Sequence, residues 1–209
     1  MQALLTKVAP SITDMIRADH SRVLATFHRY KTGTGAGTKQ ALVASICLAL
    51  EVHAQAEEEI FYPAMGSIDP ATVGKLIPEH DRMRNLIGAL RGMDAGAPEY
   101  DSTVMELMRD VLRHVADEET KLLPDAERVL GERRLAELGV QMTRRRMELA
   151  APHIRDLAVG NARTFPGVAL AFTGLLAVGG LLAARALARP WNGVQRLARP
   201  GRRLRALAG

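Results

Sequence analysis

The chain has 209 residues, a formal net charge of +5 and one cysteine, Cys47. A single cysteine excludes an internal disulfide framework and a cysteine-based zinc cluster. Apolar and charged fractions of 47% and 24% exclude wholesale disorder. The charge is unevenly placed, because residues 163–209 contain eight arginines and no acid, whereas residues 1–162 contain 20 Lys and Arg against 23 Asp and Glu. The basic balance therefore belongs to the tail.

Four helices of similar length are predicted in the first 124 residues. The first begins near Ser11 and has apolar residues at helical spacing up to Tyr30, and the second covers about residues 39–62. The third covers about residues 71–93 and the fourth about 99–123, and prolines are expected to end the second and fourth helices. Short loops between helices of similar length are typical of an antiparallel up-down-up-down bundle. We therefore predict an all-α four-helix bundle with an additional C-terminal helical segment.

An internal repeat is the strongest signal in the sequence. Both halves have an acid–His–x–Arg motif, then a His-x3-Glu motif, and the two histidines are 33 positions apart in the first half and 34 in the second. A proline follows each second histidine by ten residues. The first half has Asp19-His20-Ser21-Arg22, His53 with Glu57, and Pro63, and the second has Glu79-His80-Asp81-Arg82, His114 with Glu118, and Pro124. The predicted bundle is therefore one helix pair used twice.

The repeated residue types are those of a metal site. A four-residue step places His and Glu about 40° apart on one face of an α-helix, so both can bind one ion. The acids that follow, Glu58, Glu59 and Glu119, rotate away from that face. A single histidine is more often structural, but the same types recur at the same offsets, which favours a site that suits iron, manganese or zinc. The six candidate ligands are His20, His53, Glu57, His80, His114 and Glu118.

These motifs resemble those of the hemerythrin-like family, also called the HHE cation-binding domain. The family pattern is an acid–His pair on the first and third helices and a His-x3-Glu-Glu followed by a proline on the second and fourth. The resemblance spans about Ile12 to Pro124. It implies a non-haem di-iron centre with the six candidate residues as ligands and the two glutamates bridging. Two iron ions are expected ahead of manganese or zinc.

The resemblance has one departure. Oxygen-carrying members of the family have a fifth histidine one helical turn from another on the third helix, and here Leu76 and Arg84 flank His80 at those positions. His28, eight residues from His20, is a possible substitute ligand, although a structural role is favoured for it, and His153 is expected to be structural. The resemblance implies a protein that binds oxygen or a related small ligand, such as nitric oxide or peroxide, in sensing, detoxification or iron handling. It leaves open whether the protein is an enzyme.

Two further regions follow the predicted bundle of residues 1–124. Residues 125–163 are predicted to form a charged helical connector, and residues 164–209 a hydrophobic helix, a possible membrane anchor, with an arginine-rich tail. Residues 164–184 carry no charge over 21 positions, which is about 31 Å as a helix and enough to cross a bilayer. A buried or dimerising helix is the alternative for this segment.

We expect a cytoplasmic protein, with residues 164–184 as a candidate attachment to the inner face of the membrane and membrane lipid as a partner. A membrane-attached helical adaptor without a redox metal is the alternative function. Nucleic-acid binding is not expected, because the tail has no binding motif and one aromatic residue apart from those of the apolar run. The sequence does not predict the oligomeric state.

Overall fold

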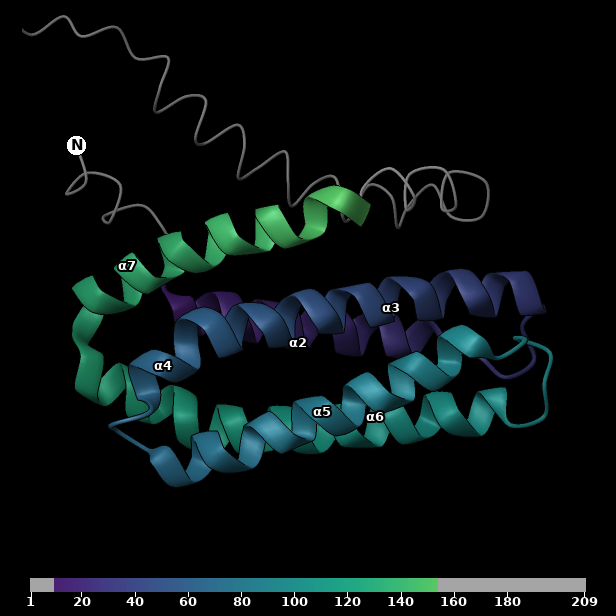
Figure 1. Cartoon of the computed structure of the whole chain (residues 1–209), viewed down its shortest axis with the longest axis horizontal. Helices are drawn as coiled ribbons and strands as arrows, with labels where there is room; N and C mark the ends of the chain where they lie inside the picture. Colours follow the sequence, from purple (N-terminus) through teal and green to yellow (C-terminus); the bar gives the residue numbers. More distant parts are fainter. Residues whose placement is uncertain (1–9, 154–209) are drawn as a thin grey trace, which may run out of the picture. The chain divides into compact units, whose positions relative to one another are not determined.

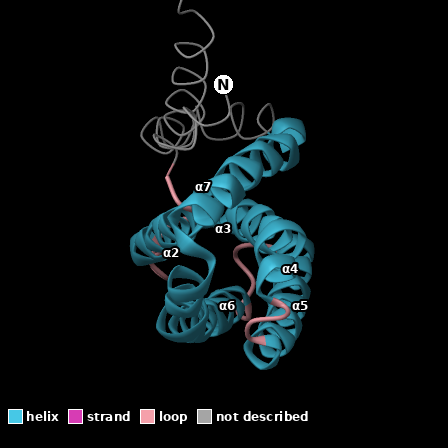
Figure 2. Cartoon of the chain, turned by 90° about the vertical axis from the view of Figure 1, so that its left-hand side faces the viewer, coloured by secondary structure: helices cyan, strands magenta, loops and turns pink. Residues whose placement is uncertain are grey.

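The computed structural model describes residues 10–153, and every regular element within that range is a helix (Figure 1). Helices α2, α3, α5 and α6 surround a common core, which Figure 2 shows end-on. The predicted all-α four-helix bundle is therefore confirmed. The elements are α2 (Ile12–Arg29), α3 (Ala36–Ala56), η1 (Glu57–Phe61), α4 (Tyr62–Met65), α5 (Pro70–Gly92), α6 (Tyr100–Asp117), η2 (Glu118–Leu122), α7 (Leu123–Ala150) and η3 (Ala151–His153).

Side-chain caps set the starts of two bundle helices. The Ser11 hydroxyl accepts a hydrogen bond from the backbone N–H of Asp14 and begins α2. The Asp69 carboxylate accepts one from the backbone N–H of Thr72 and begins α5, whose first residue is Pro70. Both caps satisfy N–H groups that have no partner within the helix, and a proline at the first position has no N–H to satisfy.

The two helices with a His-x3-Glu motif continue past their predicted ends. In each half the glutamate of the motif begins a π-helical segment, η1 or η2, in which backbone hydrogen bonds reach five residues back. Pro63 and Pro124 lie in the first turn of the α-helical segment that follows, the part of a helix in which proline is best tolerated. The prediction that these prolines end the helices is therefore wrong. Short π-helical segments of this kind are frequent at functional sites.

A layer of histidines and acids, here called the polar layer, separates two apolar clusters in the bundle. It contains His20, His53, His80 and His114 with Glu57 and Glu118. Cys47 belongs to one of them, with 1% of its surface exposed, and burial raises the pKa of its thiol to about 12. The polar layer therefore has buried apolar side chains on both sides along the bundle. The largest members of the first cluster are Phe27, Tyr30, Ile46, Ile87, Tyr100 and Leu107, and those of the second are Ile12, Ile16, Phe61, Tyr62, Leu76, Leu122 and Leu138.

Helix α7 turns back and packs on the bundle. Gly131 breaks its regular geometry with φ 71° and ψ 158°, a conformation that is nearly exclusive to glycine. Beyond this kink the helix runs back over α2 and α3 (Figures 1 and 2). Its apolar residues, Leu135 and Leu138 among them, join the cluster of Ile12 and Ile16. The described part of the predicted connector is therefore docked on the domain.

Gly139 is the point of closest approach between α7 and the start of α2. A β-carbon at this position would lie 2.4 Å from the carbonyl oxygen of Pro10 and 3.2 Å from the backbone nitrogen of Ile12. We expect Gly139→Ala to lower the free energy of unfolding by about 1–3 kcal/mol, because rigid backbone must move. Thermal denaturation measures the change. Gly88→Ala is the matched control, since nothing lies within 4 Å of its added carbon, and a similar loss in both variants would contradict the prediction.

The candidate membrane segment, residues 164–184, lies outside the described residues. Among the helices of residues 10–153, none combines the length and apolar character that a bilayer span requires.

Candidate metal centre

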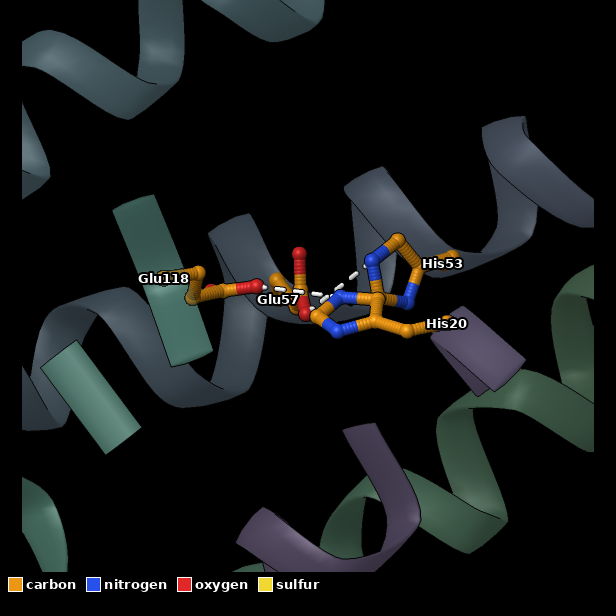
Figure 3. A group of neighbouring side chains, drawn as sticks. All are labelled: His20, His53, Glu57 and Glu118. Atoms are coloured by element: carbon orange, nitrogen blue, oxygen red, sulfur yellow. Dashed lines mark ion pairs between the residues drawn. The ribbon is translucent and has the colours of Figure 1, made fainter. Parts of the chain in front are cut away.

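The structure brings all six predicted ligand residues together in the polar layer. Each side chain comes from a different helical segment: α2, α3, α5 and α6 supply one histidine each, and η1 and η2 supply one glutamate each. His53 is the most exposed at 7%, while Glu57 and Glu118 are fully buried. Figure 3 shows that His20, His53, Glu57 and Glu118 point toward one another.

The ligand atoms form two groups that share a residue. The first group is His20, His53, Glu57 and Glu118, and the second is Glu57 with His80 and His114. Within each group the nitrogen and oxygen atoms all lie within 4.8 Å of one another. Because both groups contain Glu57, two ions in these places would be neighbours joined by one carboxylate.

The two carboxylates face both halves of the repeat. Glu57 directs Oε1 to His53 Nε2 at 3.2 Å and Oε2 to His80 Nε2 at 3.5 Å. The Oε2 atom of Glu118 lies 3.2 Å from His20 Nε2 and 3.7 Å from His114 Nε2. Atoms bound to one ion at about 2.1 Å lie about 3.0–3.4 Å apart in tetrahedral or octahedral geometry. The observed separations are close to that spacing.

The buried polar atoms of this layer fit a bound cation. Six of them have no hydrogen-bond partner among the residues that the structure describes: His20 Nε2, both ring nitrogens of His53, Glu57 Oε1 and both oxygens of Glu118. Burying a polar atom without a partner costs about 1–3 kcal/mol, and more for a charge. Imidazole nitrogens and carboxylate oxygens that face one another without protein donors are the ligand set that iron, manganese or zinc accepts.

A second ring of carboxylates faces Nδ1 of the four candidate ligand histidines, within hydrogen-bond distance at His20, His80 and His114 and farther away at His53. An ionised carboxylate can only accept a hydrogen bond, so this contact favours the proton on Nδ1 and leaves Nε2 free to bind an ion. Each of these acids comes from a different helix from its histidine, which ties the bundle together at the site. The Nδ1 contacts are His20 to Glu119 at 2.8 Å, His80 to Glu58 at 2.8 Å, His114 to Glu79 at 3.3 Å and His53 to Asp19 at the longer distance of 3.7 Å.

Sequence reasoning missed the roles of these outer acids. Glu58 and Glu119 do rotate away from the ligand atoms, as an α-helical extrapolation predicts, but the rotation brings each one to a histidine of the other half. Asp19 and Glu79 were part of the repeat, and their recurrence beside a histidine in both halves was a signal that could have identified them.

Burial and mutual charge shift the protonation of the inner residues. Burial lowers the pKa of His53 to about 4 and also lowers the pKa of His80, so both rings are neutral at pH 7. Burial and the charge of Glu118 raise the pKa of Glu57 well above its ordinary value. Burial opposes ionisation of Glu118 too, but its close contact with His20 and the charge of His114 lower its pKa to about 2. Without a cation, the two carboxylates therefore do not both ionise readily.

A small apolar cavity adjoins the histidines. Its volume is about 20 Å³, and Leu50, Met83, Ile87 and Val111 line it together with the four histidines and other residues. A water molecule needs about 10–15 Å³ by this kind of measure. The cavity therefore has room for about one or two small atoms beside the ligand atoms.

Other histidines lie apart from the site. His28 and His153 are exposed, and neither belongs to the two groups of ligand atoms. Leu76 is fully buried in an apolar cluster, and Arg84 forms ion pairs with Glu58 and Asp81.

The model of the hemerythrin HHE cation binding domain family matches residues 11–126, which is more than half of the chain. The chain belongs to this family. Helices α2 to α6 and both π-helical segments of the HHE domain fall within the match, whereas α7 beyond its first residues lies outside it. The candidate ligands and the outer acids are all HHE-domain residues.

A curated relative and a solved structure resemble the HHE domain. A protein named DNA nickase from a Nostoc species is 31% identical over 113 residues, which are 54% of this chain and 32% of the relative. The chain thus spans about a third of that relative's length. The crystal structure of a hemerythrin HHE cation binding domain-containing protein of Mycobacterium kansasii superposes with a TM-score of 0.60 and 18% identity. The superposition covers 77% of this chain and 97% of the other, and it supports the fold.

Proposed function

We propose that the protein binds two iron ions in its HHE domain and uses them to bind oxygen or a related small ligand, nitric oxide or peroxide. His20 and His53 would hold one ion, His80 and His114 the other, and Glu57 and Glu118 would bridge them. The observation that carries this proposal is Glu57, whose two oxygens face a histidine of each half at 3.2 and 3.5 Å. Manganese or zinc would suit the same side chains, but the redox chemistry of oxygen, nitric oxide and peroxide favours iron.

The residues around the site support a small ligand. When bound, iron supplies the redox chemistry, and the protein supplies neutral imidazoles, buried carboxylates and a dry pocket. The apolar cavity of about 20 Å³ suits a diatomic molecule or peroxide. The apolar clusters on both sides of the polar layer exclude bulk water from it.

The proposed site has four histidine ligands and no fifth one on α5, which bears on the proposed role. Leu76 and Arg84 occupy the two neighbouring positions on α5, and both are engaged elsewhere, in the apolar core and in ion pairs. Each ion would then have two histidines, which leaves coordination positions for a ligand. This composition favours sensing, detoxification or iron handling over reversible oxygen carriage.

Metal analysis and spectroscopy test the proposal. Protein purified and loaded with ferrous iron without oxygen should contain two irons per chain, and exposure to air should produce new visible absorption. His53→Ala and His114→Ala should each lower the iron content. A colourless protein without bound metal, unchanged by either substitution, would instead support a helical adaptor. Turnover of peroxide by the loaded protein would distinguish an enzyme from a sensor.

A further inference from the structure

The outer acid that faces His53 is itself held by two arginines. Both guanidinium groups donate to the same oxygen of Asp19, Arg22 from Nη1 at 2.8 Å and Arg146 from Nη2 at 2.7 Å. The other oxygen, Oδ2, faces His53 Nδ1 at 3.7 Å. Because Oδ1 is fixed from two directions, the carboxylate cannot rotate freely, and Oδ2 is presented to the imidazole.

The two arginines differ in burial and in origin. Arg22 lies one turn from Asp19 on the same helix, and 49% of its side chain is exposed. Arg146 comes from α7, 127 residues away in sequence, and 17% of its side chain is exposed. A less exposed ion pair is screened less by solvent, so Arg146 is the stronger restraint on Asp19.

Within residues 10–153, the second half of the repeat has no equivalent of this contact. Glu79 occupies the place of Asp19 and faces His114, but its cationic partners are Lys75 at 3.9 Å and Arg82 at 4.0 Å. About half of each of those side chains is exposed. The two acids are therefore supported differently: among the described residues, Asp19 has an arginine partner from outside the matched residues 11–126, whereas the cationic partners of Glu79 lie within them.

We propose that Arg146 is a positioning residue of the metal centre, which fixes Asp19 and through it His53, so that the ion held by His20 and His53 depends on docked α7. The proposal rests on the proposed function for the ion. The segment that brings Arg146 to Asp19 is the one that turns at Gly131 and packs closely at Gly139. Docking of α7 would thus strengthen one half of the centre and leave the other unaffected.

Arg146→Gln and Arg145→Gln form a matched pair of variants. Arg145 is the next residue on α7 and pairs with Glu59 and Glu148, away from the centre. Metal affinity is measured by competition with a chelator for ferrous iron. We expect Arg146→Gln to weaken one of the two ions about tenfold or more, Arg146→Lys to recover part of the affinity, and Arg145→Gln to match the parent. The proposal would be overturned if Arg146→Gln bound each of the two ions as tightly as the parent does.

A second measurement separates this inference from the proposed function. Nitrogen-15 NMR of the histidine rings in the metal-free protein reports the proton position and environment of each imidazole. We expect Arg146→Gln to shift the His53 ring signals and to leave those of His80 and His114 in place, with Arg145→Gln again unchanged. A parent that binds no metal would refute the proposed function, whereas unchanged His53 signals in Arg146→Gln would refute the role of Arg146.

Discussion

Glu57→Gln is expected to remove both metal ions, the largest effect of any single substitution at the centre. Glu57 belongs to both groups of ligand atoms, and an amide replaces its two anionic oxygens with one neutral oxygen and a donor of the same size. We expect affinity for each ion to fall at least a hundredfold, because the loss of a ligand exceeds that of an outer contact, which costs 10–100-fold. Metal content after desalting, with a chelator titration, measures both losses.

Substitution of a histidine that belongs to only one group of ligand atoms should give a different pattern of metal loss. His53 belongs only to the first group and His114 only to the second, so each alanine variant should lose mainly one ion. Glu59→Gln is the control, because Glu59 lies on the surface of η1 and contacts Gln55 and Arg145. Retention of two ions by Glu57→Gln, or equal losses in Glu57→Gln and Glu59→Gln, would contradict the shared role.

Removal of the metal should lower the stability of the domain strongly. A ligand present at 1,000 times its dissociation constant, and bound by the folded state alone, stabilises a protein by about 4 kcal/mol. Two such ions together correspond to a fall of about 15–30 °C in the melting temperature of a domain of this size. Calorimetry before and after chelation measures the difference, and reloading with ferrous iron should restore the higher temperature.

The metal-free state provides the control for this prediction. Burial and the charge of Glu118 raise the pKa of Glu57, so ionising it opposes folding when no cation is present. Glu57→Gln removes that charge at constant shape. We therefore expect the metal-free variant to melt above the metal-free parent and to gain little from added iron. A metal-free parent as stable as the loaded protein would count against a bound metal at this site.

The sequence predicted the bundle and the meeting of six residues because both follow from short-range patterns. Helical periodicity and loop length indicate the bundle, and the repeat of His20 and His80 with their downstream motifs singles out the site. Helix ends were less predictable, since Pro63 and Pro124 are read as stops only if the preceding turn is α-helical. The π-helical segments change the hydrogen-bond spacing without any residue type that demands it.

Contacts between distant segments were beyond sequence reasoning. The apolar residues of α7 are sparse among its charges, so its docking was not visible in the periodicity. Arg146 is the last of three consecutive arginines, Arg144 to Arg146, and it reaches Asp19 only through the docking of α7 beyond the kink at Gly131. A single sequence without the fold cannot distinguish them.

The crossed contacts of the outer acids bear on how the domain assembles. His20 of the first half faces Glu119 of the second, and His80 of the second half faces Glu58 of the first. Each group of ligand atoms likewise draws on both halves. A helix pair released as a separate fragment would contain three of the candidate ligands but neither complete group. Such a pair could complete either group only by associating with a second pair, so binding of the proposed ions would be a late step that follows the meeting of the two halves during folding.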